Sequence, residues 1–126
     1  MKIDWNIVRL MCAGPVNGMR NNYTDGLTKQ YGHLEFQCVL NLPDKLLSYT
    51  LNTLGIRVSQ GEKFTAGQTI EDLFEGAKVR LDEAKEAGRT VLRVIMPDPG
   101  FRWPEDPNCT APYKYQIMRV YEDDRD

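Results

Sequence analysis

The stretch LEFQCVL, residues 34–40, decides the fold. Its apolar residues stand at positions 34, 36, 38 and 40, with Glu35 and Gln37 between them. Side chains of a β-strand alternate between two faces, so this pattern predicts a strand with one buried and one solvated face. The residues expected on the buried face are Leu34, Phe36, Cys38 and Leu40.

A helix is expected directly after this strand. Asn41 suits an N-cap, Pro43 suits a first turn, and Asp44 complements the positive helix end. The helix should end near Gly61. The residues that recur at helical spacing are Leu46, Leu47, Thr50, Leu51, Leu54 and Val58.

A second helix is predicted for residues 69–88. Thr69 with Asp72 three residues later resembles a capping box. Ala77, Val79 and Leu81 also alternate with charged residues, so a strand over residues 77–82 stays open as the alternative. The residues that line one helical face are Ile70, Leu73, Phe74, Ala77, Leu81 and Ala84.

Further strands are predicted at residues 3–12, 23–27, 90–96 and 113–121, and turn-rich segments at residues 13–22 and 28–32. The length suits one domain over residues 1–126. We therefore expect an α+β fold, with an antiparallel or mixed sheet of about five strands and two helices packed on one face.

The charge balance excludes generic nucleic-acid binding. Sixteen Lys and Arg residues against 18 Asp and Glu residues give a net charge of −2, which leaves no cationic excess for a polyanion. No apolar run is long enough to span a bilayer, and the first residues lack a signal-peptide core. Cys12, Cys38 and Cys109 lie far apart, as is typical of a reducing compartment. We expect a cytoplasmic protein that does not bind membranes.

Several motifs, taken in order, resemble a known family. They are YTDGLT at residues 23–28, YGHLE at 31–35, Leu42-Pro43, Leu51-Asn52, Val58, Gly61, Phe64, Met96-Pro97-Asp98 and Trp103-Pro104. This order is similar to that of domain of unknown function 4262, a family of bacteria and their phages, from about Trp5 to Gln116. Asp25 and Leu34 depart from it, since the family has an apolar residue and a proline there. The family has no established activity, so the resemblance implies a fold more than a function.

His33 is the single histidine of the sequence, so proton transfer by imidazole must use it. Glu35 is a candidate to orient its ring, and Cys109 in a predicted loop is a candidate thiolate. The alternative interpretation places His33 at the end of a turn and Glu35 on the solvated side of the strand. The chain carries no paired metal ligands and no nucleotide-cofactor motif, so neither a metal nor a cofactor is predicted.

Residues 97–112 are a predicted loop of 16 residues with five prolines. A loop of this length in a compact domain either packs on its own side chains or carries function. We expect a ligand site for an anionic, ring-bearing molecule, built from Arg93, Arg102, Trp103 and Tyr115. In the alternative interpretation Arg93 forms a structural salt bridge and the aromatic residues attach the loop to the sheet.

The leading functional hypothesis is a non-enzymatic binding protein, such as a phage accessory or anti-defence protein. It would sequester a nucleotide-like small molecule or block a host factor. One alternative is a small hydrolase or transferase that uses His33 with Glu35 or Cys109. Another is a structural or oligomer-forming subunit, and a homodimer is the expected oligomer.

The alternation at residues 34–40 generates a stability prediction. Phe36→Ala should lower the free energy of unfolding by about 3 to 5 kcal/mol, because it leaves a cavity in the core. Chemical denaturation measures this loss. A decrease below about 1 kcal/mol would show that Phe36 does not lie on a buried face.

Overall fold

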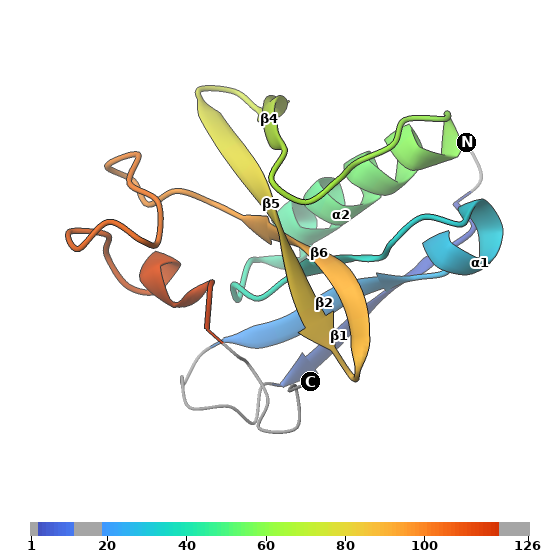
Figure 1. The fold of residues 1–126 in the computed structure, drawn as a ribbon, viewed down its shortest axis with the longest axis horizontal. Helices are drawn as coiled ribbons and strands as arrows, with labels where there is room; N and C mark the ends of the chain where they lie inside the picture. The colour runs from blue at the N-terminus through green and yellow to red at the C-terminus, as the bar shows by residue number, and fades with distance from the viewer. Residues whose placement is uncertain (1–2, 12–18, 119–126) are drawn as a thin grey trace.

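The computed structural model describes residues 3–11 and 19–118. Within them the chain forms one mixed sheet with the strand order β1-β2-β3-β6-β5-β4 (Figure 1). The strands are β1 (Asn6–Met11), β2 (Arg20–Asp25), β3 (Phe36–Cys38), β4 (Thr69–Phe74), β5 (Ala77–Glu86) and β6 (Arg89–Ile95). The helices of this part of the chain are α1 (Leu27–Tyr31) and α2 (Asp44–Ser59). The α+β class is therefore confirmed, with six strands in the described segments rather than about five.

A parallel pair of strands joins two antiparallel meanders in the described part of the chain. β1, β2 and β3 lie side by side, and so do β4, β5 and β6. β3 pairs with β6 in parallel, with Phe36 opposite Leu92 and Gln37 opposite Arg93. Parallel strands need a long crossover connection, which here contains α2, β4 and β5.

The helix α2 covers one face of the sheet (Figure 1). The prediction of a helix after Asn41 is confirmed, and the helix spans Asp44–Ser59. No helix in the described segments is long and apolar enough to cross a membrane. The core between α2 and the sheet includes Phe36, Cys38, Leu47, Leu51, Leu54, Val58, Val79, Leu81, Leu92 and Val94.

The strand predicted at residues 34–40 is shorter than expected. Phe36, Cys38 and Leu40 are buried as predicted, but Leu34 is exposed. The prediction of a solvated face is wrong, because Gln37 is fully buried and Glu35 is 3% exposed. Gln37 lies in a side-chain network that crosses the sheet, so its burial leaves its amide hydrogen-bonded.

Glu35 is buried because its carboxylate binds the start of α1. Its Oε1 accepts hydrogen bonds from Thr24 Oγ1 at 2.8 Å and from the Leu27 N–H at 3.1 Å. Its Oε2 accepts from the N–H groups of Thr28 at 3.0 Å and Gly26 at 3.2 Å. The N–H groups of a first helical turn have no partners within the helix, and a carboxylate supplies them. The turn expected at residues 28–32 is therefore the short helix α1.

The prediction of a helix at residues 69–88 is wrong. β4 and β5 form an antiparallel hairpin instead. The alternative of a strand over residues 77–82 is correct, and β5 continues from there to Glu86. Gly76 turns the chain with a φ of +78°, a conformation that glycine adopts without strain. Val79 and Leu81 then reach the core at alternate positions.

The helical spacing in β4 has a local cause. The pairing with β5 shifts its register between Ile70 and Phe74, which marks a bulge or irregularity in the strand. The irregularity places Ile70 and Leu73, three residues apart, in the same core. A three-residue spacing is also the signal of an amphipathic helix, so the sequence pattern was ambiguous.

The strands predicted at residues 3–12 and 90–96 are present as β1 and β6, but β1 begins at Asn6 rather than at residue 3, and residue 12 lies outside the described residues. The strand predicted at residues 23–27 begins earlier, at Arg20. It includes Asn22, which was expected in a loop. The Asn22 amide donates to the carbonyls of Cys38 and Leu40 at 2.9 and 3.1 Å, and these bonds compensate for its burial.

The strand predicted at residues 113–121 is wrong for its described part. Tyr113–Tyr115 forms a 3-10 turn, and turns continue to Met118, beyond which residues 119–121 lie outside the described residues. Gln116 explains the difference. Its side chain accepts from the Met96 N–H at 2.8 Å and donates to the Met96 carbonyl at 2.6 Å. The side chain thus occupies the backbone groups that a neighbouring strand would use.

The burial of Glu35 generates a second prediction. Glu35→Ala should lower the free energy of unfolding by about 2 to 4 kcal/mol, because it leaves buried donors of Thr24 and Leu27 without acceptors. Chemical denaturation measures the loss. Glu83→Ala is the control, since Glu83 is exposed on β5. Equal stability of the two variants would contradict the proposed role of Glu35.

Candidate functional site

The predicted loop at residues 97–112 is held in shape by the carboxylate of Asp98, which is 2% exposed. Its Oδ1 accepts from the N–H groups of Gly100 at 3.0 Å and Arg102 at 2.9 Å. Its Oδ2 accepts from the Arg102 guanidinium at 3.0 Å and from the N–H and hydroxyl of Thr110 at 2.9 and 3.1 Å. Burial disfavours the ionised form, but the donors of Arg102 and Thr110 outweigh it and hold the pKa of Asp98 well below its ordinary value.

Arg80 of β5 attaches the same loop to the sheet. Its guanidinium donates to both carboxylate oxygens of Glu105, at 2.9 and 2.8 Å, and to those of Asp82 at 2.8 and 2.9 Å. The hydrogen bonds to Glu105 and Asp82 raise the pKa of Arg80 above its ordinary value. The guanidinium carbon also lies 5.2 Å from the centre of the Trp103 ring. The indole is therefore held by a cation–π contact beside β5.

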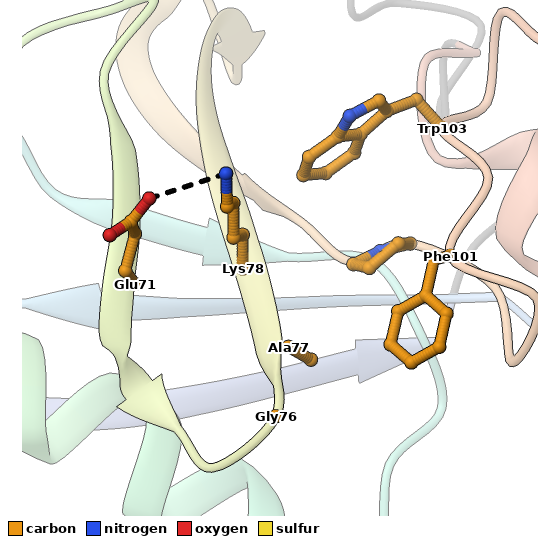
Figure 2. Close-up of a pocket in the computed structure, with 7 residues that line it drawn as sticks. Glu71, Gly76, Ala77, Lys78, Phe101 and Trp103 are labelled. Atoms are coloured by element: carbon orange, nitrogen blue, oxygen red, sulfur yellow. Dashed lines mark ion pairs between the residues drawn. The ribbon is translucent and has the colours of Figure 1, made fainter.

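A groove of about 490 Å³ lies between this loop and the β4–β5 hairpin (Figure 2). Its volume falls within the range of small-molecule sites, about 300 to 1,000 Å³. The residues that line it are Glu71, Gly76, Ala77, Lys78, Pro97, Phe101 and Trp103. In Figure 2, Trp103 extends from the loop toward β5, the Phe101 ring lies below it in this view, and Lys78 lies between Glu71 and Trp103.

Phe101 is the exposed aromatic residue of the groove, with 70% of its surface accessible. Its backbone has a φ of +63°, which is rare for a residue with a Cβ. Its N–H donates to the Asp98 carbonyl at 2.9 Å, within the turn that Asp98 organises. The fold thus presents a phenyl ring to solvent instead of burying it.

Of the four predicted ligand-binding residues, the groove contains Trp103. Arg93, Arg102 and Tyr115 are not among its lining residues. The Arg102 guanidinium donates to Asp98 and so stabilises the loop from within. The Tyr115 ring packs against the core, with the Lys114 ammonium over it at 5.2 Å.

Arg93 lies in the polar network that crosses the sheet. It donates to the Gln37 side chain at 2.7 Å, and to the carbonyls of Gln116 and Met118 at 2.9 and 2.8 Å. Gln37 donates in turn to Asn21 at 2.8 Å. These bonds connect β6, β3 and β2 to the turns at residues 116–118 that follow the loop, which gives the Arg93 guanidinium a structural role.

The proposed enzymatic residues have separate structural roles. Nδ1 of His33 lies 2.8 Å from the Leu34 carbonyl, and Nε2 accepts from the Phe64 N–H at 3.0 Å. Both ring nitrogens of His33 are therefore used by backbone groups. Glu35 binds the start of α1, as described above. No hydrogen bond or ion pair within residues 3–11 and 19–118 joins any two of His33, Glu35 and Cys109.

The described cysteines are buried thiols. Burial raises the pKa of the Cys38 thiol to about 11. Burial and the nearby Asp98 carboxylate also raise the pKa of the Cys109 thiol, which disfavours a thiolate there. Cys12 lies outside the described residues. Within residues 3–11 and 19–118, no group of three or more His, Cys, Asp or Glu side chains is placed to hold a metal ion.

The sequence-based hypothesis missed Glu71 and Lys78, which form an ion pair across the hairpin at 3.2 Å. The predicted helix over residues 69–88 places positions seven apart about 10 Å from each other along its axis. In the hairpin the same positions are neighbours on adjacent strands. The signal that predicts their pairing is Glu75-Gly76 as a turn, with Lys78 and Arg80 alternating with apolar residues.

A comparison with protein families finds one described as Domain of unknown function (DUF4262), whose model matches residues 4–110. This match confirms the resemblance based on the sequence motifs. No curated protein and no solved structure matches the chain significantly.

The role of Asp98 generates a third prediction. Asp98→Asn should speed hydrogen–deuterium exchange at the N–H groups of Arg102 and Thr110, because a neutral amide is a weaker acceptor than a carboxylate. In the wild type, the pKa of Asp98 is lowered by folding. The protection should therefore persist above the unfolded pKa, about 4, and decrease as the pH falls below it.

Asp106→Asn is the matched control, because Asp106 lies in the same loop, is exposed, and accepts from the Asn108 N–H. Unchanged exchange at Arg102 and Thr110 in Asp98→Asn would contradict the role assigned to this carboxylate.

Proposed function

The chain belongs to the DUF4262 family, and we propose that it is a non-enzymatic protein that binds a nucleotide-like, ring-bearing small molecule in the groove between β4–β5 and the loop at residues 97–112. The observation that carries the proposal is the exposed Phe101 ring beside Trp103. A flat ring can stack on such side chains. Stacking of a base on an aromatic side chain contributes to the affinity whichever base is bound.

The rigidity of the loop supports binding. Asp98 and Arg80 hold the loop from within and against β5. A ligand that enters a preformed site does not have to order it, so less binding free energy is lost to conformational entropy. Phe101 is exposed and so does not attach the loop to the sheet, whereas Trp103 contacts Arg80 of β5.

The charges of the groove favour a neutral ring over a cation. Aromatic residues with a carboxylate such as Glu71 can bind a quaternary ammonium group. Here Lys78 lies in the same groove, and the Arg80 guanidinium already lies over Trp103. Arg80 thus already makes the cation–π contact with Trp103 that a cationic ligand would make. Phosphates of a bound nucleotide would extend toward solvent, since the groove is open and its lining residues Glu71 and Lys78 are exposed.

The acid–base groups of the groove support binding without catalysis. Of the residues that line it in the described structure, Glu71 and Lys78 are the titratable ones, and they are exposed and paired with each other. A cytoplasmic protein that holds such a molecule unchanged acts by sequestering it. That role fits a phage accessory or anti-defence protein. The protein is also expected to form a homodimer, which light scattering tests.

Calorimetric titration with purine and pyrimidine nucleoside monophosphates tests the proposal. Trp103→Ala and Phe101→Ala should each weaken binding by about 1 to 3 kcal/mol, the contribution of one stacking partner. Phe101→Ala should leave the melting temperature unchanged, because its ring is exposed.

Leu46→Ala is the control, since Leu46 is an exposed apolar residue of α2 outside the groove. If the wild type binds none of the nucleotides, or if Phe101→Ala and Leu46→Ala bind equally, the proposal is wrong.

A further inference from the structure

The Glu71–Lys78 ion pair lines the same groove as the aromatic side chains of Phe101 and Trp103. Both residues line the groove together with Trp103 and Phe101, and both come from the floor formed by the hairpin (Figure 2). The ammonium of Lys78 is a donor, and the two carboxylate oxygens of Glu71 are acceptors. A ring that stacks on Phe101 or Trp103 would therefore have one donor group and a pair of acceptor oxygens in the same groove.

This pair is available to a ligand. Its N–O distance is 3.2 Å, and the side chains of Lys78 and Glu71 are 61% and 71% exposed. Exposed ion pairs contribute little to stability, so a ligand that replaces this contact costs the fold little. By contrast, Arg80 forms ion pairs with both Asp82 and Glu105, so a ligand would have to replace two contacts to bind its guanidinium.

Resting on the proposed function, we infer that the groove selects a guanine-type ring. The Watson–Crick edge of guanine presents the acceptor O6 followed by the donors N1–H and N2–H. Lys78 would donate to O6, and the two oxygens of Glu71 would accept from N1–H and N2–H. Adenine offers a single donor group beside its acceptor N1, so it forms fewer charge-assisted bonds with this pair.

Inosine monophosphate (IMP) measures the contribution of the 2-amino group of guanine to the affinity. Its base has the O6 and N1–H of guanine but lacks the 2-amino group, so it loses one bond to Glu71. Calorimetric titrations of the wild type with GMP, IMP and AMP should give an affinity for GMP that is about tenfold higher than for the other two, the effect of one charge-assisted hydrogen bond at an open site.

Glu71→Gln should reduce the preference for GMP to within about twofold, because an amide has one acceptor oxygen and no charge. Glu83→Gln is the matched control on β5 and should keep the wild-type preference, since Glu83 does not line the groove. Thermal melts of both variants establish that they are folded.

Equal affinities of the wild type for GMP and AMP, or a preference that survives Glu71→Gln, would overturn the inference and leave the proposed function standing. Binding of none of the three nucleotides would overturn both.

Discussion

The short parallel pairing of β3 with β6 is the constraint on which the rest of the structure depends. It joins the meander of β1, β2 and β3 to that of β4, β5 and β6 through the pairs Phe36–Leu92 and Gln37–Arg93. α2 covers this junction on one face. On the other face the Gln37 and Arg93 side chains bond to each other, and Arg93 bonds to the carbonyl of Gln116 in the turns that follow the long loop. The junction in the middle of the sheet thus also fixes the turns that follow the long loop.

Buried carboxylates replace backbone ladders where the chain leaves the sheet. Glu35 accepts four hydrogen bonds at the start of α1, and Asp98 accepts five within the long loop. Each satisfies backbone N–H groups that have no strand or helical partner. This explains how a loop rich in proline can hold Phe101 and Trp103 in fixed positions. It also accounts for the motif around residues 23–35, whose Thr24, Gly26 and Glu35 serve the fold.

The sequence predicted the elements whose periodicity is undisturbed, such as α2 and β6. It failed where tertiary contacts override local pattern. The irregular pairing of β4 imitates helical spacing, so the hairpin and its Glu71–Lys78 pair were missed. Gln116 bonds to the backbone of Met96 and prevents the last predicted strand in its described part. Neither a cross-strand pairing shift nor a long-range side-chain bond is encoded in neighbouring residues.

The most direct measurement of the central claim is the NMR signal of the two indole N–H groups during titration with a nucleotide. Trp103 lines the groove, whereas Trp5 is buried and donates to Asn52 at 2.9 Å, so it is an internal reference in the same molecule. Stacking in the groove predicts a saturating shift of the Trp103 signal and a stationary Trp5 signal. A stationary Trp103 signal, or equal movement of both, would contradict a binding site at this groove.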